Sequence, residues 1–365
     1  MGDIAEFSTA RISSVKLDCK NYVSTENMLQ DFQGVVEAKS VPNETNVISF
    51  TCGDILISNI RPYLKKVWKA TFDGGCSSDV FVLQATDTVA KDYLHYAVAN
   101  DKFINYVMSG AKGVKMPRGD KNQMRTYQLS LPSIQEQYKI AKLLTLLDER
   151  IATQSKLIED LKKLKSAIID YAINSLDTDF AKFGSLYEMA GEGGTPTTSN
   201  ASFYDNGKIP FIKIDDLKKK YLTENKDFIT ELGLQKSSAW LVPSRSILFS
   251  NGATIGEITI TTYPVCTKQG ILGIVPKPNI DVEFLYYFMS SSYFKKAVSR
   301  IVTEGTMKTA YLKDINNIRC PIPIKEKQQD IAKMPSALNS KIDFEQSILK
   351  RFCSQKQYLL RQMFM

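Results

Sequence analysis

The sequence of 365 residues contains one histidine, His95, and this scarcity excludes several kinds of functional site. A His-Glu-x-x-His zinc site needs two histidines on one helix face, so this chain cannot form one. A serine or cysteine nucleophile with a histidine base would have to rest on His95 alone. His95 lies in the apolar-periodic stretch 93–97, and we interpret it as a packed or surface residue of a helix.

Motifs of enzymes that work alone are also absent. No segment reads Gly-x-x-x-x-Gly-Lys-Ser/Thr, the loop that holds phosphates in nucleotide-binding enzymes. Neither Asn-Pro-Pro-Tyr nor Asp-Pro-Pro-Tyr occurs, and these tetrapeptides form the loop that grips a flipped adenine in amino-methyltransferases. We therefore expect a non-catalytic chain with no catalytic residue and no metal ligand.

Long apolar runs and clustered cysteines are missing as well. No stretch of 18 uncharged apolar residues occurs, which excludes a membrane-spanning helix. The first residues carry neither the basic nor the apolar segment of a secretory signal, so the cytoplasm is the expected location. No Cys-x-x-Cys pair is present, and we predict reduced thiols at all six cysteines, which are Cys19, Cys52, Cys76, Cys266, Cys320 and Cys353.

Acidic residues are fewer than basic ones. The 47 Lys and Arg residues against 39 Asp and Glu residues give a net charge of +8. This excess is compatible with a polyanionic partner but does not by itself establish one. The length of the chain predicts two or three domains.

The sequence contains an internal repeat with a separation of 191 positions. Eight residues at and after Pro132 have identical partners at this separation: Pro132, Gln137, Ile140, Ala141, Lys142, Leu147, Ile151 and Lys165 match Pro323, Gln328, Ile331, Ala332, Lys333, Leu338, Ile342 and Lys356. Upstream, residues 54–59 match 246–251 after a shift of one position. The shared order of these matches indicates a duplicated unit.

Each repeat is predicted to combine a β-rich front part with helices. Strand-like runs occur at 54–57, 80–83, 247–249, 258–262 and 271–275, and shorter helical stretches at 91–108 and 282–302. A long amphipathic helix then closes each repeat. We predict an α+β fold with two tandem mixed α/β domains and two long helices, with boundaries at 1–131, 132–175, 176–322 and 323–365.

The first long helix is predicted to begin after Pro132 with a Ser133-x-x-Glu136 capping box. Apolar positions then step by four and three, which is the pattern of a coiled-coil seam. Packing of each helix on its own domain is the alternative, but the duplication favours antiparallel pairing of the two helices. The predicted pairing residues are Ile140, Leu144, Leu147, Ile151, Ile158, Leu161, Leu338, Ile342, Leu349 and Phe352. Pro335 predicts either a kink in the second helix or its start.

Two similar domains joined by helices of roughly 58 Å would suit duplex DNA, whose major grooves recur about every 34 Å on one face. Three polar or basic loops occur at equivalent places in each repeat. Lys and Arg would neutralise phosphates, while Asn, Gln, Ser and Thr suit bases or backbone. Ordinary solvated loops are the alternative. The predicted DNA-binding residues are Ser58, Asn59, Arg61, Lys65, Lys66, Ser78, Lys112, Lys115, Arg118, Lys121, Asn251, Thr267, Lys268, Gln269, Thr306 and Lys308.

Two other features are interpreted as structural. The basic run 218–220 follows two aspartates, so we interpret it as a solvated face rather than a DNA site. Trp68 and Trp240 could stack on bases, but core packing is the preferred interpretation for both.

The chain resembles the specificity subunit of Type I restriction–modification systems. The resemblance rests on the unit order, on Leu-Pro-x-x-x-Glu-Gln-x-x-Ile at 131–140, on Gly-Asp-Ile-Leu-Ile-Ser at 53–58 and on Gly-Gly-Thr-Pro at 193–196. It covers nearly the whole chain and implies two target-recognition domains, each reading one half of a bipartite DNA sequence. The second helix departs from the pattern, because Lys327 precedes Gln328 where the first repeat has Glu136.

The resemblance also implies partners. The paired helices would set the spacing and dock two modification subunits, which bind S-adenosylmethionine and methylate adenine, while this chain binds no cofactor. Restriction subunits would join to make the ATP-dependent nuclease. Two alternatives stay open: a stand-alone DNA-binding or architectural protein, and a nuclease with a cryptic site at Asp314 and Glu326.

Overall fold

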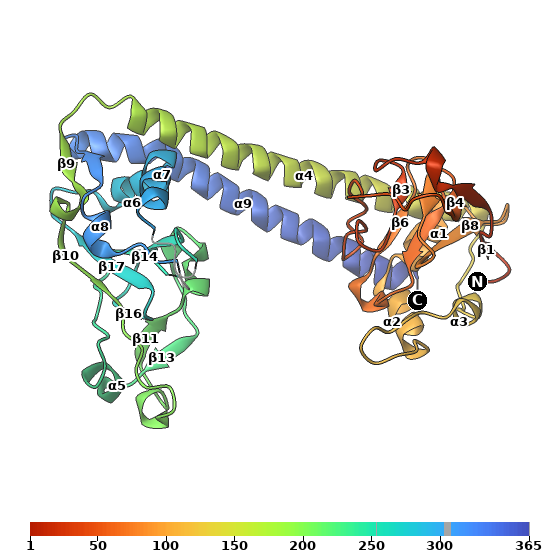
Figure 1. The fold of residues 1–365 in the computed structure, drawn as a ribbon, viewed down its shortest axis with the longest axis horizontal. Coiled ribbons are helices and arrows are strands. Elements are labelled where there is room, and N and C mark those ends of the chain that lie inside the picture. The colour runs from red at the N-terminus through yellow and green to blue at the C-terminus, as the bar shows by residue number, and fades with distance from the viewer. Residues whose placement is uncertain (253, 303–307, 365) are drawn as a thin grey trace. The chain divides into compact units, whose positions relative to one another are not determined.

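The computed structural model describes residues 1–252, 254–302 and 308–364 (Figure 1). The chain forms two compact units, Met1–Ser155 with Ser347–Met365, and Lys156–Gln346. We call them unit 1 and unit 2. Each unit combines one β-rich domain with parts of both long helices, so each is described by itself.

Unit 1 contains two four-stranded sheets. The first has the order β1-β8-β5-β6 and is antiparallel throughout, and the second has the order β2-β4-β7-β3 with β3 and β7 parallel. The strands are β1 (Ala5–Phe7), β2 (Arg11–Ser13), β3 (Tyr22–Val23), β4 (Asn46–Phe50), β5 (Ile55–Ser58), β6 (Val67–Lys69), β7 (Gly74–Cys76) and β8 (Val80–Ala85). The helices of this domain are α1 (Lys91–Val98), α2 (Asp101–Ser109) and α3 (Lys121–Arg125), with short 3-10 turns η1 (Ser14–Lys16) and η2 (Pro62–Leu64).

Unit 2 repeats this plan with an additional strand pair. Its sheets have the orders β10-β17-β14-β15-β12, β13-β11-β16 and β18-β9. The strands are β9 (Phe180–Lys182), β10 (Tyr187–Glu192), β11 (Ile209–Ile212), β12 (Tyr221–Leu222), β13 (Asp227–Ile229), β14 (Ile247–Ser250), β15 (Ile258–Thr261), β16 (Cys266–Thr267), β17 (Ile271–Pro276) and β18 (Arg319–Pro321). The helices are α5 (Glu231–Gln235), α6 (Val282–Ser290), α7 (Ser292–Ile301) and α8 (Leu312–Ile315), with 3-10 turns η3 (Phe183–Ser185), η4 (Ala201–Phe203) and η5 (Ile214–Lys218).

The central strand of each unit is buried on both faces, which explains its continuous apolar sequence. In β5, Ile55 and Ile57 pack in the cluster that includes α1 and α2, while Leu56 packs on the opposite side with Phe50 of β4. In β14, Ile247 and Phe249 likewise face the helices, and Leu248 packs with Ile212 of β11. The five predicted strand-like runs correspond to β5, β8, β14, β15 and β17.

Each predicted short helical stretch is in fact two helices. In unit 1 the Asn100 side chain accepts a hydrogen bond from the Phe103 amide at 3.1 Å and donates to the Ala97 carbonyl at 2.7 Å. Asn100 therefore ends α1 and caps α2. Ser291 does the same between α6 and α7, where its hydroxyl accepts from the Phe294 amide at 3.2 Å. The apolar periodicity continues across both caps, which is why the sequence suggested one helix.

The long helices are α4 (Ile134–Asn174) and α9 (Lys325–Met363). The Ser133 hydroxyl accepts a hydrogen bond from the Glu136 amide at 3.4 Å, which is one half of the predicted capping box. Helix α9 begins ten residues before Pro335, so Pro335 lies inside the helix and does not start it. Its missing amide leaves the Ile331 carbonyl without the usual intrahelical donor.

The two long helices pair in antiparallel fashion within each unit. In unit 1, Asp148 forms an ion pair with Lys356 at 2.5 Å, and Arg150 lies over the ring of Phe352 at 5.3 Å. Partner numbers fall on α9 as they rise on α4, which is the antiparallel order. In unit 2, the Lys165 ammonium donates to Asn339 Oδ1 at 3.0 Å. All ten residues predicted for helix pairing are buried or half-buried.

The same contacts recur in the two units at the spacing of the repeat. Gln137 Oε1 accepts from the Ala90 amide at 2.9 Å, and its Nε2 donates to the Pro132 carbonyl at 3.0 Å. In unit 2, Gln328 bonds in the same way to the Asp281 amide and the Pro323 carbonyl, both at 2.8 Å. Both glutamines are 1% exposed. Each ties the start of a long helix to the start of a shorter one.

Several further expectations agree with the structure. All six cysteines are free thiols, and burial raises the pKa of Cys76 to about 12 and that of Cys266 to about 11. Trp68 packs edge-on against Phe50 at 6.1 Å, within the apolar contacts of unit 1. Of the described helices, none combines the length and the apolar character needed to cross a membrane.

The interpretation of the basic run 218–220 is wrong for its last residue. Lys218 and Lys219 are exposed, but the Lys220 side chain is only 2% exposed. Its ammonium forms an ion pair with Glu283 of α6, donates to the Ser336 hydroxyl of α9 at 2.9 Å, and lies over the ring of Tyr287 at 4.7 Å. The run looked solvated because the sequence does not show that the chain after η5 brings Lys220 against α6 and α9.

Candidate nucleic-acid interface

The three predicted loops of unit 1 meet at one place. The Asn59 amide, just after β5, donates to the Asp79 carbonyl at 2.8 Å. The Gly119 amide then donates to the Asn59 carbonyl at 3.0 Å, which brings the third loop against the first. Arg118 of the third loop forms an ion pair with Asp79 of the second at 3.2 Å. Loops that are far apart in the sequence therefore share one surface.

The third loop is a short hairpin between α2 and α3 (Figure 1). Lys112 and Arg118 exchange both backbone hydrogen bonds, at 3.0 and 2.9 Å, so residues 113–117 form its tip. The Arg61 amide donates to the Pro117 carbonyl at 2.8 Å and holds the hairpin against the first loop. Arg61 has a left-handed backbone with φ of 51°, which turns the chain toward the hairpin.

Five of the residues predicted to bind DNA in unit 1 are exposed at these loops: Arg61, Ser78, Lys112, Lys115 and Arg118. Two of the cations also have acidic neighbours within the loops. Lys112 lies 3.4 Å from Asp120, but its side chain remains 84% exposed. These ion pairs are accessible to solvent and therefore weak, so a phosphate can compete for the cation. Contact of these residues with DNA stays a prediction.

Three predicted cations are already engaged elsewhere in unit 1. Lys65 forms an ion pair with Asp101 of α2 at 2.8 Å, and Lys66 donates to the Thr25 carbonyl at 2.5 Å. Lys121 lies over the ring of Phe81 at 4.7 Å, and burial lowers the pKa of both Lys66 and Lys121. These three half-exposed side chains have partners within the domain, and their contact with DNA stays a prediction.

The last residue of the central strand and the residue after it, both polar, are more enclosed. Ser58 is 2% exposed, and its hydroxyl donates to the Ile60 carbonyl at 3.0 Å. Asn59 is half-buried, and its backbone carries the hydrogen bonds that join the three loops. Both residues therefore shape the loops, and burial argues against direct base reading by Ser58.

Unit 2 brings its equivalent loops together in the same way. The Asn251 amide donates to the Gly270 carbonyl at 3.0 Å, and the Ala310 amide donates to the Asn251 carbonyl at 2.9 Å. Asn251 and Thr267 are 1% and 0% exposed, so their side chains position the loops and are not placed to touch DNA. Lys268, Gln269 and Lys308 are exposed. Thr306 lies outside the described residues.

The Gly-Gly-Thr-Pro stretch has a structural role beside this surface. A side chain at Gly193 would come within 2.2 Å of the Thr267 carbonyl oxygen, so only glycine permits the close approach. The Gln269 amide donates to the Thr195 hydroxyl at 3.4 Å, and the Lys268 amide to the Ile212 carbonyl at 2.9 Å. Thr195 therefore borders the predicted loop, and so does Lys213, the residue after Ile212. Sequence reasoning did not select either residue, although the glycine pair was a usable signal.

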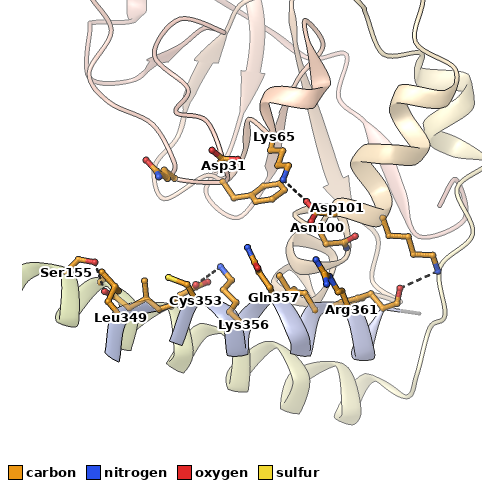
Figure 2. A pocket seen from close by; sticks show the side chains of 18 residues that line it. Asp31, Lys65, Asn100, Asp101, Ser155, Leu349, Cys353, Lys356, Gln357 and Arg361 are labelled. Atoms are coloured by element: carbon orange, nitrogen blue, oxygen red, sulfur yellow. Dashed lines mark hydrogen bonds and ion pairs between the residues drawn. The ribbon is translucent and has the colours of Figure 1, made fainter. Parts of the chain in front are cut away.

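A separate groove of about 1250 Å³ lies within unit 1, between the β-rich domain and the long helices (Figure 2). Its charged groups include the Lys65–Asp101 and Lys356–Asp148 ion pairs. Arg361 of α9 and Phe364, the residue after this helix, also line it. Among the residues that the structure describes, no group of three or more His, Cys, Asp or Glu side chains could hold a metal ion.

Comparison with known families accounts for both repeats. The family model of the Type I restriction modification DNA specificity domain matches residues 1–163 and 177–351. The chain belongs to this family. The two matched segments are the two repeats found in the sequence, and each contains one set of converging loops.

Individual specificity subunits show how far the similarity extends. The chain is 32% identical to the Type I restriction enzyme MjaIX specificity subunit of Methanocaldococcus jannaschii over 173 residues, which are 46% of this chain and 39% of the relative. It is 25% identical to the MjaVIII specificity subunit of the same organism over 296 residues, 74% of this chain and 69% of the relative. The first alignment thus spans less than two thirds of the relative's own length.

Solved structures share the fold. The Type I restriction–modification S subunit from M. genitalium aligns with a TM-score of 0.60 at 15% identity, over 100% of this chain and 94% of that one. A chain from a study of complex assembly in the type I R-M system aligns with a TM-score of 0.63 at 17% identity, over 99% and 95%. The predicted α+β architecture of two tandem domains with long paired helices is confirmed.

Proposed function

We propose that this specificity-family chain is the sequence-specific DNA recognition and scaffold subunit of a Type I restriction–modification complex. The observation that carries the proposal is a repeated one. Each unit brings three loops together by equivalent backbone hydrogen bonds, and each also contains a part of the long-helix pair. A non-catalytic subunit that reads a DNA site in two halves requires two such surfaces.

The loops supply the groups that DNA recognition requires. In unit 1, Lys112, Lys115 and Arg118 of the third loop and Ser78 of the second loop are all exposed, and Arg118 pairs with Asp79, the residue after Ser78. In unit 2, exposed Lys268 lies next to Gln269, an amide of the type that pairs with adenine. Cations would fix the duplex by its phosphates and the neutral side chains would read base edges.

The helices offer surfaces for protein partners. Outside the buried seam, α4 exposes large apolar side chains: Tyr138, Leu143 and Leu146 in unit 1, and Leu157, Leu164 and Tyr171 in unit 2. Helix α9 exposes Met334, Phe344 and Tyr358. Apolar side chains in this density on a helix surface are typical of protein interfaces. We propose that two modification subunits dock there, one for each repeat, with S-adenosylmethionine bound by those subunits and restriction subunits joining the complex.

Co-expression with the modification subunit of the same organism tests the proposal. We expect this chain and the modification subunit to co-purify, and the complex to methylate adenine in DNA. Neither subunit alone is expected to methylate DNA at a defined sequence. A chain that binds DNA but never captures the modification subunit would support the stand-alone alternative and contradict the proposal.

A further inference from the structure

The tip of the unit 1 hairpin exposes apolar side chains instead of packing them. Val114 is fully exposed, at 103% of its reference area, and Met116 is 48% exposed. An apolar side chain that is exposed at the end of a projecting hairpin does not stabilise the fold, because it buries little surface against the rest of the domain. Further burial of these two side chains therefore requires a binding partner.

The neighbours of the tip indicate what kind of partner fits. Lys112 and Arg118 flank the tip, Lys115 lies within it, and all three are exposed. Three cations around two apolar side chains are complementary to a polyanion that also offers an apolar group. Duplex DNA meets both requirements, since its phosphates surround grooves that contain the thymine C5-methyl group.

The shape of the hairpin favours the major groove. Its two chains are held together by the Lys112 and Arg118 backbone hydrogen bonds, and its base is fixed to the first loop through Arg61 and Asn59. The major groove, about 12 Å wide, admits a two-stranded element without deformation of the duplex, whereas the minor groove, about 6 Å wide, must be widened first. Gly113, with φ of +96°, provides the turn that projects Val114 from this fixed base.

We propose that Val114 and Met116 contact thymine methyl groups in the major groove of the half-site read by unit 1. Lys112, Lys115 and Arg118 bind the flanking phosphates. This assignment rests on the proposed DNA recognition function and adds the base feature that the hairpin reads. At this position the hairpin then distinguishes thymine by its methyl group and not by a hydrogen bond to the base edge.

Replacing thymine by uracil tests the contact, because uracil lacks only the methyl group. The assembled complex is titrated with duplexes of the mapped recognition sequence in which each thymine of one half-site is changed in turn. At one or two positions we expect wild-type affinity to fall about fourfold, the effect of about one lost methyl contact. The Val114→Ala plus Met116→Ala variant is expected to bind the thymine and uracil duplexes equally at those positions.

A matched control is available in the same domain. Val15 is 74% exposed in η1 and belongs to none of the three loops. The Val15→Ala variant is expected to keep the full response to uracil. Thermal unfolding of all variants should match wild type, since none of these side chains is buried.

The outcomes separate this inference from the function on which it rests. If wild type binds its site specifically but no uracil substitution acts through Val114 or Met116, the methyl contact is contradicted. If the hairpin variant instead loses the modification subunit with unchanged DNA affinity, the tip is a protein contact and the inference fails. If wild type shows no sequence preference at all, the proposed recognition function fails first.

Discussion

At the level of individual residues, the surroundings of the single histidine determine its protonation. His95 is half-buried in α1, next to Tyr96, with its Nδ1 atom buried, and it takes no part in the candidate interface. Burial, with nearby Lys356 adding to it, lowers the pKa of His95 to about 4. The lone histidine is therefore a packed neutral residue, as its place in an apolar-periodic stretch suggested.

This low pKa predicts how stability depends on pH. The unfolded chain binds a proton at His95 near pH 6.5, and the folded chain only near pH 4, so acid favours unfolding in this window. We expect His95 to cost about 3 kcal/mol of stability as the pH falls from 7 to 4. The His95→Phe variant should lose less stability over the same interval in denaturant unfolding. Identical pH profiles for both proteins would contradict this account.

Replacing a buried glutamine should lower the free energy of unfolding more than replacing an exposed glutamine of the same helix. Gln137→Leu would leave the Ala90 amide and the Pro132 carbonyl without their side-chain partner. We expect a loss of about 1–3 kcal/mol in the free energy of unfolding, the usual cost of buried unpaired polar groups. Gln135→Leu, at an exposed position of α4, is the control and should stay within about 0.5 kcal/mol of wild type.

Buried and exposed apolar side chains lie close together on the long helices. The seam of α4 and α9 is buried or half-buried, while residues beside it on α4, such as Leu143 and Leu146, are exposed. Leu144 is 0% exposed and packs in the same cluster as Leu360, whereas Leu146 is 53% exposed. Two leucines only two positions apart therefore have different predicted roles.

The paired substitutions Leu144→Ala and Leu146→Ala separate these roles. Leu144→Ala removes buried methyl groups and leaves a cavity, so we expect a loss of about 2–5 kcal/mol in unfolding experiments. Leu146→Ala should leave stability nearly unchanged and weaken co-purification of the modification subunit. A large loss of stability for Leu146→Ala would show that its exposed position is misassigned.

The exposed lysines of the unit 1 hairpin predict how DNA affinity depends on salt concentration. Lys112→Ala with Lys115→Ala removes two exposed cations, so DNA binding should weaken and its logarithmic salt slope should fall by about 2. The control pair Lys16→Ala with Lys20→Ala removes two exposed cations of the same domain away from the loops. A slope that stays unchanged in the hairpin variant would contradict its phosphate role.

The sequence predicted five of the strands and the two long helices, because apolar periodicity and the 191-residue spacing record them directly. It placed three loops at equivalent positions of each repeat, but it did not predict that these loops meet, because the backbone hydrogen bonds that join them depend on the fold. It could not predict which cations are free. Lys65, Lys66 and Lys220 have the same local sequence character as exposed lysines, but each pairs with a group far away in the chain. Burial of Ser58, Asn251 and Thr267 likewise depends on packing between loops and strands, which no local pattern reveals.

For the chain as a whole, duplication is the organising feature. Lys165 and Lys356 are repeat equivalents, and they contact Asn339 and Asp148, which are equivalents as well. The loops of the two units use equivalent backbone hydrogen bonds but carry different exposed side chains. Conserved contacts with divergent loops are what two recognition domains with different half-sites require.

Long-read mapping of methylated adenines gives the most direct test of this view. In cells that express this chain with its modification subunit, we predict a two-part motif with a fixed spacer that disappears when this gene is deleted. The Lys268→Ala plus Gln269→Ala variant should relax one half of the motif and leave the other half intact. A single continuous motif, or methylation that persists without this gene, would contradict the account.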